Sequence, residues 1–78
     1  MVNKKKYNDV FLEIFAIEEA QLEGLEYNAI QQWDSVGHMG LMTALEEVFD
    51  IMLDMDEIIS FNSYKKGLEI IAKHNIQM

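Results

Sequence analysis

The sequence predicts an all-α protein: a small four-helix bundle with three longer helices, one short helix and a long first loop. Two observations favour this fold. Apolar residues recur every three or four positions along most of the chain, which is the spacing of one helix face. No run alternates apolar and polar residues clearly enough to require a strand. Seventy-eight residues suffice for one compact core and are too few for two, so residues 1–78 are expected to form a single domain.

The first helix is expected over residues 4–17, followed by a long loop over residues 18–34. The helix follows from apolar residues at i, i+3, i+4, i+7 and i+8, namely Tyr7, Val10, Phe11, Ile14 and Phe15. Around Gly24 the periodicity fades, and a loop of this length in a compact domain tends to be functional or mobile. We expect Trp33, at the end of the loop, to anchor it to the bundle.

Three more helices are expected after the loop. Asp34 is a favoured residue type at a helix N-cap, so the second helix begins at Ser35 and runs to about Phe49. A short third helix is expected near residues 55–60. Asn62 or Ser63 can cap the last helix, which is expected to fray after His74.

The second helix has two distinct apolar faces. One is as wide as the stripe that a helix packs into a bundle core, and it contains Leu41, Met42, Leu45, Val48 and Phe49. The opposite face combines apolar and acidic residues: Val36, Met39, Thr43, Gly40, Glu46, Glu47 and Asp50. An apolar patch rimmed by carboxylates suits the docking of a basic partner. The alternative is that these are scattered exposed hydrophobic residues, which are common on small proteins.

Charge and composition exclude several classes of function. Fourteen acidic residues against six lysines give a net charge of −8, the wrong sign for binding nucleic acid or an anionic membrane surface. No apolar run approaches the roughly 18 residues of a membrane span, so we expect a cytoplasmic protein without membrane insertion. The chain has no cysteine, and any thiol chemistry must therefore come from an attached group.

The start of the second helix carries the most specific motif. It reads Asp34-Ser35-Val36-Gly37-His38-Met39 and continues through Ala44-Leu45-Glu46-Glu47-Val48-Phe49-Asp50. This string resembles the phosphopantetheine attachment region of acyl carrier proteins, which reads Asp-Ser-Leu, then an aliphatic residue or Met, then a Leu-Glu-Glu-Phe run. The similarity spans nearly the whole chain, including the acidic connector, the Phe-Asn-Ser turn and the last amphipathic helix. This chain departs from the family's motif in two ways. Val36 stands where Leu is usual, and Gly37 and Gly40 weaken the helix.

The resemblance implies a free-standing acyl carrier, not an enzyme. Ser35, next to Asp34, would receive 4'-phosphopantetheine from coenzyme A through a magnesium-dependent phosphopantetheinyl transferase. The arm would carry acyl thioesters between loading, modifying and acyl-transferring enzymes with basic docking surfaces, in a specialised branch of fatty acid or lipid biosynthesis. By the same resemblance the partner-binding residues are Val36, Met39, Thr43, Glu46 and Glu47. We expect the protein to be a monomer.

Other interpretations of the same residues stay open. The cargo could be aminoacyl or peptidyl, or the chain could be an acidic helical interaction module that is never modified. Ser35 could simply serve helix capping, whereas a hydrolase is disfavoured because the sequence offers no evident base or oxyanion site. A calcium site at Asp50, Asp54, Asp56 and Glu57 lacks the EF-hand pattern. We expect a packing or polar bridging role for His38. Met39, Met42, Met52 and Met55 could line a pliable cavity that admits an acyl chain, although ordinary core packing is favoured for each of them.

Overall fold

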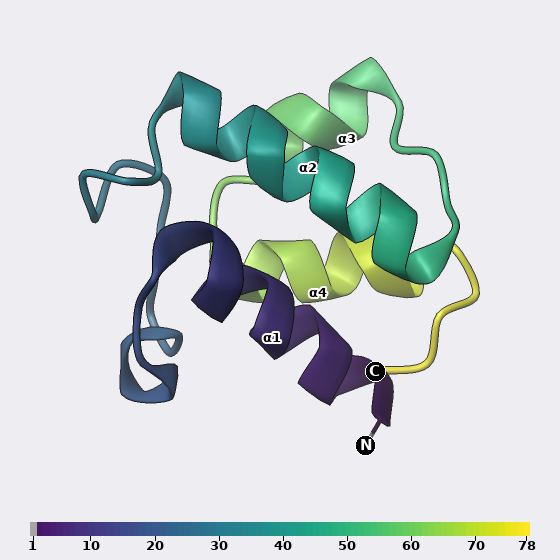
Figure 1. Ribbon diagram of the computed structural model, residues 1–78. Coiled ribbons are helices and arrows are strands. Elements are labelled where there is room, and N and C mark those ends of the chain that lie inside the picture. The colour runs from purple at the N-terminus through teal and green to yellow at the C-terminus, as the bar shows by residue number, and fades with distance from the viewer. Residues whose placement is uncertain (1) are drawn as a thin grey trace.

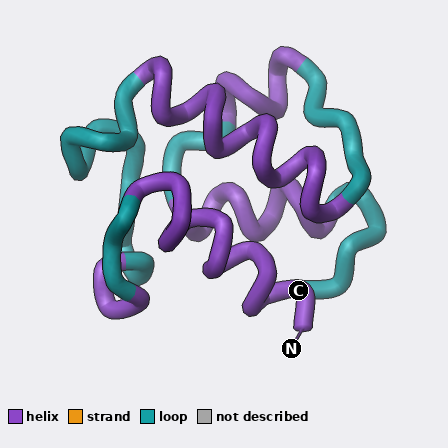
Figure 2. Tube along the Cα trace, in the orientation of Figure 1, coloured by secondary structure: helices purple, strands orange, loops and turns teal. Residues whose placement is uncertain are grey.

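Four α-helices and one short 3-10 helix make up the computed structural model, which describes residues 2–78 (Figure 1). In chain order they are α1 (Val2–Phe15), η1 (Glu19–Gln21), α2 (Ser35–Phe49), α3 (Met55–Ser60) and α4 (Tyr64–Ala72). The predicted all-α bundle of three longer helices and one short helix is confirmed. Figure 2 shows the long connection between α1 and α2, interrupted only by η1.

Local sequence signals place most helix ends correctly. The second and third helices have the predicted bounds, and Ser63 caps α4 by accepting the backbone N–H of Lys66 at 2.9 Å. Three ends were predicted wrongly. The first helix begins at Val2 rather than at residue 4. The first helix ends at Phe15 rather than at residue 17, because Ala16 has the left-handed φ of 54° that interrupts a helix. The last helix ends at Ala72, two residues before His74.

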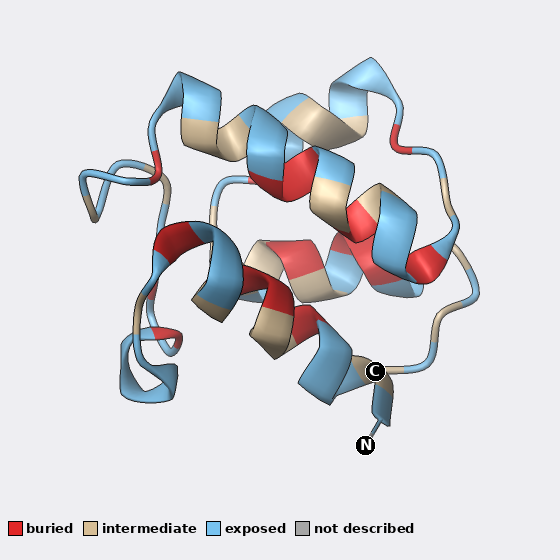
Figure 3. Cartoon of the chain, viewed as in Figure 1, coloured by how far each residue is buried: buried red, intermediate tan, exposed pale blue. Residues whose placement is uncertain are grey.

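The core is built around a cluster of aromatic side chains. The Trp33 ring stacks on Phe15 with centroids 5.4 Å apart and lies edge-on to Phe11 at 5.6 Å. Figure 3 shows the buried segments of α1, α2 and α4 turned toward one another. The buried hydrophobic residues come from α1, α2 and α4 and from the connections: Tyr7, Val10, Phe11, Phe15, Leu22, Leu25, Trp33, Leu41, Met42, Leu45, Phe49, Leu53, Phe61, Ile70 and Ile71.

Some residues assigned to the core lie at its margin or outside it. Val48 is 42% exposed, so the buried stripe of α2 is narrower than predicted and consists of Leu41, Met42, Leu45 and Phe49. Ile14 of α1 is 40% exposed. In a domain this small the margins of each helix face reach the surface, because the core is only a few side chains wide.

The long loop is fixed near its middle and at its end. Near its middle, the N–H of Tyr27 donates to the carbonyl oxygen of Asn62, and the N–H of Tyr64 donates to the carbonyl oxygen of Leu25, both at 2.9 Å. At its end, Trp33 is fully buried, which confirms its predicted anchoring role. The loop is therefore tied to the connection between α3 and α4, and this pairing brings Tyr27 to the beginning of α2.

Candidate functional site

The first turn of α2 presents Ser35 to solvent. Asp34 precedes it in extended conformation, and its carboxylate accepts the N–H of Gly37 at 2.8 Å, so Asp34 is the N-cap as predicted. Ser35 is exposed, and its hydroxyl lies 3.2 Å from the phenol oxygen of Tyr27. The capping is thus done by Asp34, and the alternative interpretation of Ser35 as a helix cap is wrong.

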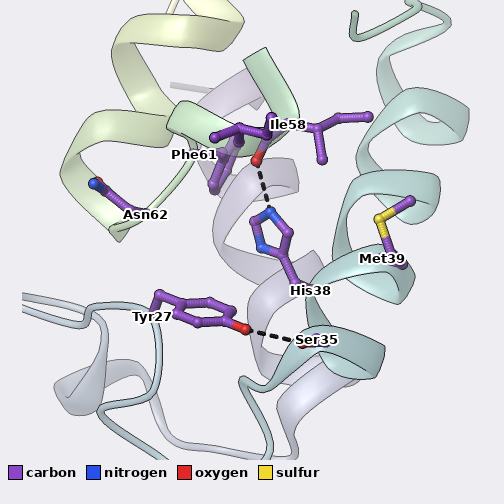
Figure 4. Close-up of a pocket in the computed structure, with 8 residues that line it drawn as sticks. Tyr27, Ser35, His38, Met39, Ile58, Phe61 and Asn62 are labelled. Carbon is purple, nitrogen blue, oxygen red and sulfur yellow. Dashed lines mark hydrogen bonds between the residues drawn. The ribbon is translucent and has the colours of Figure 1, made fainter. Parts of the chain in front are cut away.

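A cavity of about 330 Å³ opens beside the Ser35 hydroxyl (Figure 4). Its apolar walls are Met39 of α2, Ile58 and Ile59 of α3, and Phe61. Its polar groups belong to Tyr27, Ser35, His38 and Asn62. The volume lies at the lower end of the roughly 300–1,000 Å³ found for small-molecule sites. Of the residues predicted for the functional site, only Ser35 and Met39 line this cavity.

His38 connects the loop, α2 and α3. Its Nδ1 accepts the indole N–H of Trp33 at 2.9 Å, and its Nε2 lies 2.8 Å from the carbonyl oxygen of Ile58. Because an indole nitrogen can only donate and a carbonyl can only accept, the proton of the neutral ring resides on Nε2. The predicted packing or polar bridging role of His38 is confirmed, and both of its ring nitrogens are engaged within the fold.

The predicted docking residues share the outer side of α2. Val36 is 81% exposed and Met39 is 50% exposed, while Thr43 and Glu47 are also exposed. Glu46 differs, because it is half-buried and its Oε2 accepts the backbone N–H of Leu53 at 2.9 Å. In Figure 3 the outer side of α2 is largely exposed. This surface therefore contains four exposed side chains and one half-buried carboxylate that also supports the connection to α3.

A scan of protein-family models, a search of curated proteins and a search of solved structures each find no match to this chain.

Several apolar side chains outside the predicted docking residues are exposed as well. Met52, Met55 and Ile59 are between 71% and 80% exposed, so the expectation of core packing is wrong for Met52 and Met55. Met42 does pack in the core. Met39 is half exposed and lines the cavity, so core packing is wrong for Met39 and the alternative of cavity lining holds for it. Sequence reasoning missed Tyr27, Ile58 and Asn62 as site residues, because nothing in the local pattern indicates that the loop and the connection between α3 and α4 meet at Ser35.

The acidic residues after α2 serve the helix that follows. Asp54 and Glu57 form a capping box at the start of α3, and Glu57 also pairs with Nε2 of His74 at 2.8 Å. Over residues 2–78, no three His, Cys, Asp or Glu side chains gather as a possible metal site. Nor does any helix in that range have the length and apolar character needed to cross a membrane.

Proposed function

We propose that this chain is a carrier protein that holds an acyl group on a 4'-phosphopantetheine arm attached to Ser35 and delivers it to partner enzymes. One observation carries the proposal: the exposed hydroxyl of Ser35, in the first turn of α2, borders an apolar cavity between α2 and α3. A modifying enzyme can reach a hydroxyl in that position. The cavity beside it is large enough to accept a short acyl group.

The residues around Ser35 fit a phosphodiester. An anion on its oxygen would lie at the N-terminal end of the fifteen-residue α2, where the helix dipole favours negative charge. Since Asp34 caps the helix, Ser35 remains available for modification. When bound, the arm supplies the thiol that a chain without cysteine lacks.

The surroundings of Ser35 favour a carrier over a hydrolase. A nucleophilic serine needs an adjacent base, and the nearest histidine in the sequence, His38, has one ring nitrogen bound to Trp33 and the other to Ile58. The phenol of Tyr27 is the group in contact with the hydroxyl. In this proposal an external transferase activates Ser35, and the chain itself is not an enzyme.

The proposed partners are enzymes with basic docking surfaces. The net charge of −8 opposes binding to nucleic acid, and the exposed Val36, Met39 and Glu47 combine apolar contact with negative charge on α2. Together with the phosphopantetheinyl transferase, these partners would load, modify and unload the acyl group in a specialised lipid pathway of the cytoplasm. The protein would act there as a monomer.

Intact mass spectrometry tests the proposal. The folded protein is incubated with coenzyme A, magnesium and a broad-specificity phosphopantetheinyl transferase, and is compared with Ser35→Ala and with Ser60→Ala, which removes another exposed serine hydroxyl. We expect the wild type and Ser60→Ala to gain one phosphopantetheine and Ser35→Ala to gain none. No gain on the folded wild type would refute the carrier function and favour the unmodified interaction module.

A further inference from the structure

Tyr27 is the residue whose side chain contacts the proposed attachment hydroxyl. Its phenol oxygen lies 3.2 Å from Oγ of Ser35, and both side chains border the same cavity (Figure 4). We propose that Tyr27 is a positioning residue: its hydroxyl orients the Ser35 oxygen for modification and then holds the phosphodiester by a hydrogen bond. This inference rests on the proposed carrier function and adds a loop residue to its site.

Backbone hydrogen bonds and ring packing hold Tyr27 in place. Its backbone N–H donates to the carbonyl oxygen of Asn62 at 2.9 Å, and the N–H of the next residue, Asn28, donates to the carbonyl oxygen of Trp33 at 3.0 Å. Its ring lies edge-on to those of His38 and Trp33, with centroids 5.6 Å and 6.3 Å away. A phenol fixed in this way meets Ser35 with little loss of conformational freedom, as positioning requires.

Modification of Ser35 leaves only one possible direction for this hydrogen bond. In the free hydroxyl either oxygen can donate. With Tyr27 as donor, the serine proton points away from the phenol and can pass to the transferase. In the transfer, a bond forms between the Ser35 oxygen and phosphorus, the pyrophosphate P–O bond of coenzyme A breaks, adenosine bisphosphate leaves with the electron pair, and the serine proton passes to the transferase. The esterified oxygen has no proton, and the contact then persists only with Tyr27 as donor.

The variant Tyr27→Phe separates this role from packing. It keeps the ring that packs against His38 and Trp33 and removes only the hydroxyl. Tyr64→Phe is the matched control, because it also removes a tyrosine hydroxyl from the folded chain, but one that donates to Asn8 rather than contacting Ser35. Thermal unfolding by circular dichroism first establishes that both variants are folded.

Two readouts then test the inference. The first is the rate of phosphopantetheine transfer, resolved into kcat and KM for the carrier. For Tyr27→Phe we expect kcat to fall about fivefold with KM nearly unchanged, the effect of losing one ordinary hydrogen bond. The second is the phosphorus NMR signal of the modified protein, whose chemical shift we expect to move in Tyr27→Phe. Neither readout should change in Tyr64→Phe.

The outcomes separate this inference from the function on which it depends. If the wild type gains no phosphopantetheine, the carrier function and the role of Tyr27 are both refuted. If the wild type is modified while Tyr27→Phe matches it in kcat and in phosphorus shift, the carrier function stands and the positioning role is refuted. Equal changes in Tyr27→Phe and Tyr64→Phe would also overturn it, because they would indicate a general structural effect.

Discussion

The indole N–H of Trp33 donates a hydrogen bond to Nδ1 of His38 at 2.9 Å, inside the fold and five residues away in sequence. The opposite ring nitrogen of His38 donates to the carbonyl oxygen of Ile58 at 2.8 Å. One imidazole therefore fixes the end of the long loop against α2 and α2 against α3. The cavity beside Ser35 is lined by this same histidine and by Ile58, so its shape depends on the bridge.

Removal of the imidazole is expected to destabilise the domain. His38→Ala leaves the indole N–H of the fully buried Trp33 without its acceptor, and we expect the free energy of unfolding to fall by about 2–3 kcal/mol. Urea denaturation measures this, with the exposed Lys65→Ala as a control that should change it by less than about 0.5 kcal/mol. A double-mutant cycle with Trp33→Phe isolates the bond itself, and a coupling energy of zero would contradict its importance.

Alkaline pH is expected to destabilise the fold through Tyr7. Burial raises the pKa of Tyr7 far above its ordinary value of 10.0, and the neighbouring Tyr64 contributes a smaller increase. The folded state therefore keeps the phenol protonated at a pH where the unfolded chain releases the proton. This stabilising contribution is complete below the unfolded pKa and declines as the pH rises above it.

Urea denaturation at about pH 8 and about pH 11 measures the effect of Tyr7. The wild type should lose stability between the two conditions, and Tyr7→Phe should lose less. At the lower pH the variant should already be less stable by about 1 kcal/mol, because the Tyr7 hydroxyl donates to the carbonyl oxygen of Tyr64 at 2.6 Å. An equal loss in both proteins would contradict the assignment to Tyr7.

The sequence predicts those parts of the site that depend on local chemistry. Asp34 as N-cap, Ser35 as the first helical residue and the outward side of α2 all follow from residue types and helical spacing within one segment. Tyr27 could not be found in this way. Its position results from backbone pairing between the loop and residues 62–64, and neither segment carries a periodic pattern that indicates the other.

Two glycines of α2, alike in sequence terms, have different structural roles. A Cβ at Gly37 would overlap the backbone carbonyl of Gln32, so this glycine allows the loop to pass close to the helix. At Gly40 a Cβ would meet no atom within 4 Å. Helix propensity alone predicts that both glycines destabilise α2, because it contains no information about which atoms pack against them.

Alanine substitution should therefore have opposite effects at the two glycines. Gly40→Ala is expected to raise the free energy of unfolding by about 0.5–1 kcal/mol through helix propensity. Gly37→Ala gains the same propensity but must displace the Gln32 carbonyl, and we expect a net loss of stability. Urea denaturation of the two variants in parallel checks this, and stabilisation by Gly37→Ala would show that the close approach to Gln32 is unimportant.

Glu46 is expected to contribute to stability as well as to the charge of α2. Its carboxylate accepts the N–H of Leu53, a residue whose side chain is buried. Glu46→Ala should lower the free energy of unfolding by about 1–2 kcal/mol, whereas Glu46→Gln, which keeps an oxygen acceptor, should lose less than half of that. Thermal and urea unfolding of both variants measure these changes. Equal losses of stability in the two variants would mean that the charge of Glu46, and not its oxygen acceptor, stabilises the fold.

Glu47 tests partner docking more directly than Glu46, because it is exposed on the outer side of α2. Under the proposed function, Glu47→Lys should lower kcat/KM for phosphopantetheine transfer about tenfold at low ionic strength, since opposite charges accelerate encounter with a basic enzyme. The difference should shrink at high salt, where exposed charges are screened. Glu13→Lys makes the same change of charge at an exposed position of α1 and serves as control. Equal decreases in the two variants would mean that net charge, and not the outer side of α2, governs the encounter.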